Sequence, residues 1–213
     1  MSASYGKYKN ARNSSWQCLL DNRVSALPVP VARIAQENGI RLGTYAKNAT
    51  LVRSLGLEPW LRYDAFSALT STGIVTLYRD DLPRQRIRFT LAHELGHIFL
   101  GHLSPTRDTH CSVLIRSPDS TDPLEREANM FAARLLAPAC VLWGIGARSA
   151  EEISFLCDIS MQAAIIRAHR MDMLYHRESD LLASGRPSCF LSSALERQLY
   201  RTFQPFISEH KIR

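Results

Sequence analysis

Residues Arg86–His102 read RIRFTLAHELGHIFLGH and contain an H-E-x-x-H motif that begins at His93 and ends at His97. On an α-helix these two histidines lie one turn apart, about 40° round the helix axis, so both imidazoles can reach one metal ion. Glu94 flanks the same site, where its carboxylate can take a proton from an attacking water. This pattern is typical of a zinc metallopeptidase.

The motif helix is apolar on nearly every side, which predicts that it is buried. One face holds only aliphatic side chains: Ile87, Leu91, Leu95 and Ile98. The histidine pair lies about 140° away from that face. Two buried histidines and a buried glutamate need polar partners, and a metal ion is the simplest partner that satisfies all three. The alternative is a chance occurrence of a short pattern, which the helical context and a second motif disfavour.

A third histidine, His102, suggests a ligand set of the metzincin type. That set needs glycine at position 100 and histidine at position 103, but this chain has Leu100 and Leu103 there. We therefore expect His102 to be a helix-end residue and not a ligand. The loop that follows contains His110 and Cys111, an alternative ligand pair that the commoner catalytic zinc sets lack.

The second motif is the stretch Asp122–Pro138, DPLEREANMFAARLLAP, which predicts one helix bounded by its two prolines. A catalytic zinc takes three protein ligands and keeps an open position for water, and two histidines with one glutamate are a standard set. Projection places Glu125 on a face of small residues that can pack closely against the motif helix. It places Glu127 on the opposite face with Arg134, which we expect to be solvated. We therefore choose Glu125 as the third ligand.

Two further roles are possible at the start of this second helix. Asn129 lies one turn after Glu125 and can hydrogen-bond the imidazole of a ligand histidine. In a competing interpretation, Asp122 and Glu125 form a capping box, because their spacing fits that motif. The sequence leaves the choice between ligand and cap open.

The two motifs together resemble the ImmA/IrrE family of metallopeptidases, which is often found in phages and mobile elements. The family pattern is H-E-x-x-H followed by E-x-x-A-N/D-x-F-A, a leucine pair and a proline, and all of these occur within residues 74–138. The resemblance implies a zincin-like core that binds Zn²⁺ through His93, His97 and Glu125, with Glu94 as the catalytic base. Better-understood members act on helix-turn-helix repressors, so the resemblance also implies a protein substrate of that class and an anti-repressor role.

The chain as a whole predicts an α+β protein, with a zincin-like metallopeptidase core, a small sheet and a mostly helical C-terminal part. We expect three regions: a polar N-terminal segment at 1–27, the metallopeptidase domain at 28–145 and a helical region at 146–213. Short helices are expected at 31–38 and 49–55. A β-hairpin is expected within 63–79, where it either holds an extended substrate by β-addition or only covers the motif helix.

Residues 149–176 have the pattern of two helices joined by a turn, with a capping box at Ser149. A helix-turn-helix shape can bind DNA. The second helix is mostly apolar apart from Arg167 and Arg170, so we interpret the unit as a packing element and expect no direct nucleic-acid binding. A single amphipathic helix is expected at 193–207.

The 213 residues carry a net charge of +6 without a long basic run, which is compatible with an ordinary solvated surface. The five cysteines are odd in number and form no C-x-x-C pair, which predicts reduced thiols. The N-terminus lacks an apolar signal region, and no run of 18 apolar residues occurs. We therefore expect a cytoplasmic protein without a membrane span.

These observations favour a zinc-dependent metalloendopeptidase that hydrolyses a peptide bond in a helix-turn-helix repressor. The rival from another class is a non-enzymatic regulator that uses zinc as a structural staple and binds DNA or a repressor. Glu94 separates the two, because a structural zinc has no use for a base beside an open position. A toxin–antitoxin component is a third hypothesis, and the sequence leaves the oligomeric state open.

Overall fold

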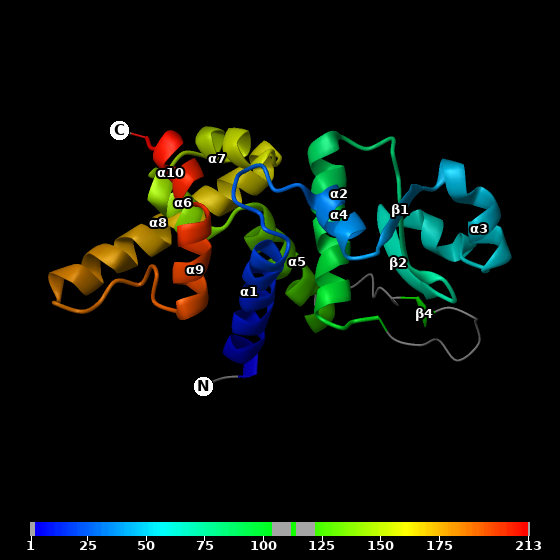
Figure 1. The fold of residues 1–213 in the computed structure, drawn as a ribbon, viewed down its shortest axis with the longest axis horizontal. Coiled ribbons are helices and arrows are strands. Elements are labelled where there is room, and N and C mark those ends of the chain that lie inside the picture. Colours follow the sequence, from blue (N-terminus) through cyan, green and yellow to red (C-terminus); the bar gives the residue numbers. More distant parts are fainter. Residues whose placement is uncertain (1–2, 104–111, 114–121, 213) are drawn as a thin grey trace. The chain divides into compact units, whose positions relative to one another are not determined.

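The structure is a computed structural model, and the residues it describes are 3–103, 112–113 and 122–212 (Figure 1). Helices dominate, and the described strands form one small mixed sheet. This architecture confirms the predicted α+β class and the mostly helical C-terminal part.

Internal packing divides the chain into two compact units. The first comprises Met1–Ser14 and Pro30–Ala132, and the second comprises Ser15–Val29 and Ala133–Arg213. Helix α1 (Ala3–Asp21) contributes residues to both units. The three regions expected from the sequence stay predictions.

The sheet of the first unit has the strand order β1-β3-β2-β4. Its strands are β1 (Arg41–Thr44), β2 (Ala65–Thr70), β3 (Gly73–Tyr78) and β4 (Ser112–Val113). Strands β2 and β3 pair antiparallel from Ala65↔Tyr78 to Thr70↔Gly73, which confirms the predicted hairpin, and β1 runs parallel to β3. In the described sheet β3 lies between β1 and β2, and β4 pairs with β2 only at Ala68 and Leu69. Substrate binding by β-addition therefore stays a prediction.

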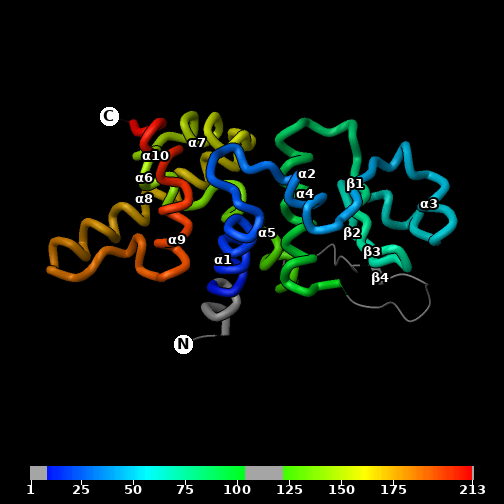
Figure 2. Tube along the Cα trace, viewed as in Figure 1, coloured from blue at the N-terminus to red at the C-terminus, as the bar shows by residue number. Residues whose placement is uncertain are grey.

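Both faces of the hairpin are covered, because alternate side chains point to opposite faces. One face packs on helix α3 (Ala49–Ser54) through an apolar cluster made by Val52, Leu57, Phe66, Ala68, Val75 and Leu77. The other face carries the buried hydroxyls of Ser67 and Thr76 and contacts helix α4. Figure 1 and Figure 2 show α3 and α4 on the two sides of these strands.

Helix α4 (Arg84–Phe99) is the predicted motif helix, and every residue from Thr90 to His97 is buried, as its apolar sequence predicts. Helices α2 (Val31–Glu37) and α3 also lie where the sequence places them. Strand β1 has no counterpart among the predicted elements. It is only four residues long, and its partner β3 lies some thirty residues further along the chain.

Helix α5 (Pro123–Leu136) lies where the second motif predicts it. The stretch Pro123–Ile145 is long and apolar enough to cross a membrane by length and composition, but 61 % of its apolar window is buried. It also consists of two helices, because Pro138 precedes the separate helix α6 (Ala139–Ile145). Such burial is typical of core helices.

The second unit holds α6 and four further helices: α7 (Ala150–Cys157), α8 (Met161–Ala183), α9 (Ala194–Thr202) and α10 (Gln204–Glu209). The capping box at the start of α7 is present, with Ser149 and Glu152 as its two partners. Helix α8 ends at Ala183 and so continues seven residues past the expected unit at 149–176.

The single helix expected at 193–207 is wrong, because the chain forms α9 and α10 instead. Pro205 occupies the second position of α10, and it lacks the backbone N–H that a continuous helix would need there. The chain therefore restarts the helix at Gln204.

Candidate metal centre

Two imidazoles on α4 form the first half of the site. His93 and His97 are both buried, and their Nε2 atoms lie 3.0 Å apart. The helical spacing of four residues brings the two rings to the same side of α4, as the motif predicts.

Helix α5 supplies the second half through Glu125. Its Oε2 lies 3.2 Å from Nε2 of His93, and its Oε1 lies 3.3 Å from Nε2 of His97. In a tetrahedral zinc site with Zn–N bonds of 2.0–2.1 Å, neighbouring donor atoms stand about 3.3 Å apart. The three donor atoms therefore fit the edges of one zinc coordination shell. Among the residues that the structure describes, these three form the group able to hold a metal ion.

The two helices can come this close because α4 has a glycine at the crossing. A Cβ atom on Gly96 would lie 3.1 Å from both Cα and the carbonyl oxygen of Ala128. One turn further along each helix, Phe99 stacks on Phe131 with ring centroids 6.0 Å apart. Gly96 therefore lets the carboxylate of Glu125 reach the two imidazoles. The small residues on α5 allow the close packing of the two helices that the sequence predicts.

The start of α5 separates the two roles that the sequence leaves open. Asp122 Oδ1 accepts a hydrogen bond from the N–H of Leu124 at 2.9 Å, which satisfies one of the free donors at the helix start. The carboxylate of Glu125 faces the two imidazoles instead. Asp122 is thus the capping residue, and Glu125 is available as a ligand.

Asn129 makes the predicted contact with His93. Its Oδ1 lies 3.0 Å from Nδ1 of that ring. An amide oxygen only accepts hydrogen bonds, so Nδ1 must carry the proton and Nε2 must keep its lone pair. That tautomer is the one that binds a metal through Nε2.

The protonation states also suit a metal. Burial by itself would raise the pKa of Glu125, but its interaction with His93 and His97 outweighs burial and holds this pKa well below its ordinary value. Burial lowers the pKa of His97. An ionised carboxylate and a neutral imidazole are the forms that coordinate metal ions.

The motif glutamate is held by the sheet. Glu94 is fully buried, and its Oε2 accepts a hydrogen bond of 2.8 Å from the hydroxyl of Ser67 on β2. The Ser67 hydroxyl lies 2.9 Å from that of Thr76 on β3. These two hydroxyls were not singled out from the sequence, although polar residues on the α4-facing side of a buried hairpin are a usable signal.

Residues 52–154 match the peptidase M78 family model, described as the IrrE N-terminal-like domain. These residues form a domain of the ImmA/IrrE family of metallopeptidases. The matched range contains both motifs, the hairpin and the three candidate ligands. No curated protein matches the chain.

One further pair of residues in this ImmA/IrrE domain lies next to the candidate ligands. His102 is buried, and its Nδ1 lies 3.0 Å from Nδ1 of His97. Its Nε2 lies 3.7 Å from Oε2 of Glu127. Burial lowers the pKa of His102, and the neighbouring His97 lowers it further.

The prediction that Glu127 is solvated is therefore wrong, since only 7 % of it is exposed. Projection gives the direction of a side chain around its own helix, but it does not reveal which segment lies in that direction. Here the segment is the end of α4. The expectation that His102 stands at a helix end is correct.

An open cleft of about 370 Å³ lies at the candidate site. His93, Glu125 and Asn129 contribute to its lining, together with Arg62, Tyr63, Asp64, Arg86, Phe89 and Thr90. Two charged lining residues are paired, because Arg86 contacts Asp64 through both Nε and a terminal nitrogen at 2.7 Å. The candidate ligands are thus accessible to a molecule entering from this side.

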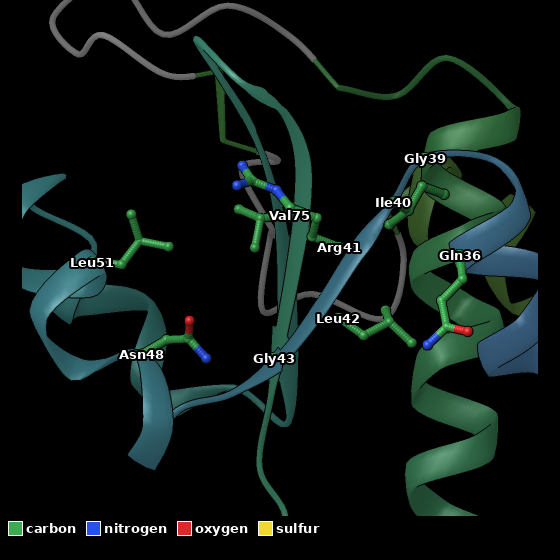
Figure 3. A pocket seen from close by; sticks show the side chains of 9 residues that line it. All are labelled: Gln36, Gly39, Ile40, Arg41, Leu42, Gly43, Asn48, Leu51 and Val75. Atoms are coloured by element: carbon green, nitrogen blue, oxygen red, sulfur yellow. The ribbon is translucent and has the colours of Figure 1, made fainter.

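A second hollow, of about 490 Å³, lies beside β1 (Figure 3). It is lined by residues of β1 and its neighbours, including Gln36, Arg41, Asn48 and Leu51. None of the candidate metal ligands lines it, so the smaller cleft is the one that matters for chemistry. The alternative ligands His110 and Cys111 lie outside the described residues.

Proposed function

We propose that this protein is a zinc-dependent endopeptidase that cleaves a peptide bond in a helix-turn-helix repressor. The observation that carries the proposal is the convergence of His93, His97 and Glu125 beside the buried carboxylate of Glu94. Family membership implies a metallopeptidase, and the open cleft gives a peptide access to the same residues.

Bound Zn²⁺ supplies a Lewis acid for the scissile carbonyl and lowers the pKa of a neighbouring water. The protein contributes the remaining parts. Glu94 takes the proton of the attacking water and passes it to the leaving amine. Ser67 fixes one oxygen of Glu94 by its hydrogen bond, and Asn129 keeps His93 in the ligand tautomer.

The substrate class rests on the resemblance to family members that act on helix-turn-helix repressors. Cleavage of such a repressor would relieve repression, which is the anti-repressor role expected of a phage or mobile-element protein. We place the protein in the cytoplasm, where repressors bind DNA and thiols stay reduced. In support, the thiols of Cys18, Cys140 and Cys189 are free.

The first test combines metal content with cleavage. Elemental mass spectrometry should find about one zinc per chain in the wild type and none in Glu125→Ala, because the variant loses one of three protein ligands. Glu94→Gln should retain the zinc. Its cleavage of a co-expressed helix-turn-helix repressor should fall by about 10²- to 10⁴-fold, the usual contribution of a general base.

The matched control is Glu151→Gln, an exposed glutamate on α7, which should retain both zinc and cleavage. If Glu94→Gln relieves repression as well as the wild type does, proteolysis is not the mechanism. Zinc binding without cleavage of any repressor would favour the non-enzymatic regulator.

A further inference from the structure

The end of helix α4 places His102 directly against His97. Gly101 has a left-handed backbone (φ 74°), its N–H donates to the carbonyl of Ile98 at 3.1 Å, and the N–H of His102 donates to the carbonyl of His97 at 2.8 Å. These two bonds form a Schellman motif, which folds the second residue after the helix cap back over the last turn. The sequence Leu-Gly-His after α4 therefore fixes where His102 lies.

The side-chain contact in this motif is unusual. A Schellman motif commonly brings two apolar side chains together, but here two buried imidazoles meet. Their Nδ1 atoms lie 3.0 Å apart, and the ring planes cross at 69°. At this distance one nitrogen must donate and the other must accept.

Only one direction of this hydrogen bond suits the rest of the site. Nε2 of His97 faces Glu125 and His93, so it must keep its lone pair if it is a ligand. Nδ1 of His97 then carries the proton and donates it to Nδ1 of His102. The proton of His102 is consequently on Nε2, which faces the buried carboxylate of Glu127 at 3.7 Å.

We propose that His102 and Glu127 are positioning residues that hold His97 in its metal-binding tautomer and orientation. His102 does for His97 what Asn129 does for His93, and the carboxylate of Glu127 orients His102 in turn. The inference rests on the proposed metal centre, and it adds two residues that neither motif assigns. Helix α5 thus supports the centre twice, through Glu125 directly and through Glu127 by way of His102.

The test measures zinc affinity by competition with a chromogenic chelator at fixed pH. Replacement of a group that orients a metal-binding histidine typically weakens metal binding by about 10- to 100-fold. We expect this loss for His102→Leu, which removes the acceptor. We expect His102→Asn to restore most of the affinity, because its amide oxygen occupies nearly the position of Nδ1. Glu127→Gln should lose less than the leucine variant, since it still accepts a hydrogen bond.

A second readout separates positioning from packing. The visible spectrum of the Co²⁺-substituted protein reports ligand geometry, and it should change in His102→Leu but not in His102→Asn. The matched control is His176→Leu, which removes an exposed histidine on α8 and should leave affinity and spectrum unchanged.

The outcomes are distinct. If the wild-type protein binds no zinc, both the proposed metal centre and the proposed function are wrong. A wild type that binds zinc, with His102→Leu equal to it in affinity and spectrum, would overturn the positioning role alone. If the leucine variant fails to fold, His102→Asn and His102→Gln decide, because the longer glutamine places its amide near Nε2 and leaves His97 without an acceptor. Tighter zinc binding by the asparagine variant supports the proposal, and equal binding by the two overturns it.

Discussion

Helices α4 and α8 both bury polar side chains, and the difference between them shows what distinguishes a site from a structural contact. On α4, His93, Glu94 and His97 lie within little more than one helical turn and are all buried, and their partners converge from β2 and α5. On α8, the buried Arg167 donates to the carbonyl of Ala137, just after the end of α5.

The two helices also differ in what they expose. On α8, 56 % of Ile165 and 67 % of Ile166 are exposed, whereas only 6 % of the charged Arg167 that follows them is exposed. This burial withdraws Arg167 from any DNA surface and supports the packing interpretation for that residue. A buried charge that donates to a backbone carbonyl is a structural contact. Several buried polar groups that converge on one point, with an open cleft beside them, indicate chemistry.

Removal of the metal should have the largest effect, and it should distinguish α4 from α8. At free zinc about a thousand times above the dissociation constant, binding stabilises the folded state by about 4 kcal/mol. A chelator should therefore lower the melting temperature, and hydrogen exchange should rise in α4 and leave α7 and α8 unchanged. Equal loss of protection in α8 would contradict the assignment of the metal to α4 and α5.

Gly96→Ala tests the close approach of the two helices. The new methyl group would lie 3.1 Å from the backbone of Ala128, so α5 must move outward and carry Glu125 with it. Overpacking of this kind costs about 1–3 kcal/mol. Chemical denaturation should give a larger cost with zinc than after chelation, because the displacement also weakens metal binding. A cost that is independent of zinc would mean that Gly96 matters for packing only.

Arg167→Met tests the structural contact that α8 makes. The variant removes the buried donor to the Ala137 carbonyl, and an unsatisfied buried acceptor costs about 1–3 kcal/mol. We expect urea denaturation to show this loss while zinc affinity stays at the wild-type value. The control is Arg170→Met, on the exposed side of α8, which should change stability by less than about 0.5 kcal/mol. Loss of zinc in Arg167→Met would contradict the purely structural role.

The smallest effect is expected at the start of α7. Hydrogen bonds from the backbone N–H groups of Arg148 and Ser149 lower the pKa of Glu152. A lowered folded-state pKa means that the stabilisation is present above the ordinary pKa and is lost as the pH falls through the lowered value. Glu152→Ala should cost about 1 kcal/mol at pH 7 and less in acid.

The control for this prediction is Glu151→Ala, which removes the neighbouring exposed carboxylate in the same first turn. It should cost less than Glu152→Ala at pH 7, because Glu151 takes no part in the capping box. Equal costs for the two variants would show that the helix dipole, and not the box, accounts for the stabilisation. Urea denaturation at pH 7 and in acid gives both values.

Much of the candidate site could be predicted because its parts depend on short-range periodicity. The spacing of His93 and His97 places both rings on one side of any helix, and the small residues of α5 identify the face that carries Glu125. The capping box of α7 is equally local. The division of 193–207 into α9 and α10 could also have been read from Pro205, whose missing N–H falls within the expected helix.

The sequence by itself determined the two helices, the candidate metal ligands and the family resemblance, since each follows from residue types at fixed spacing along the chain. Only the tertiary structure decided which groups support them. Glu127 is buried and Ser67 touches Glu94 because segments distant in sequence cover these positions. A helical projection fixes the direction of a side chain around its own axis, and only the folded chain determines what lies there.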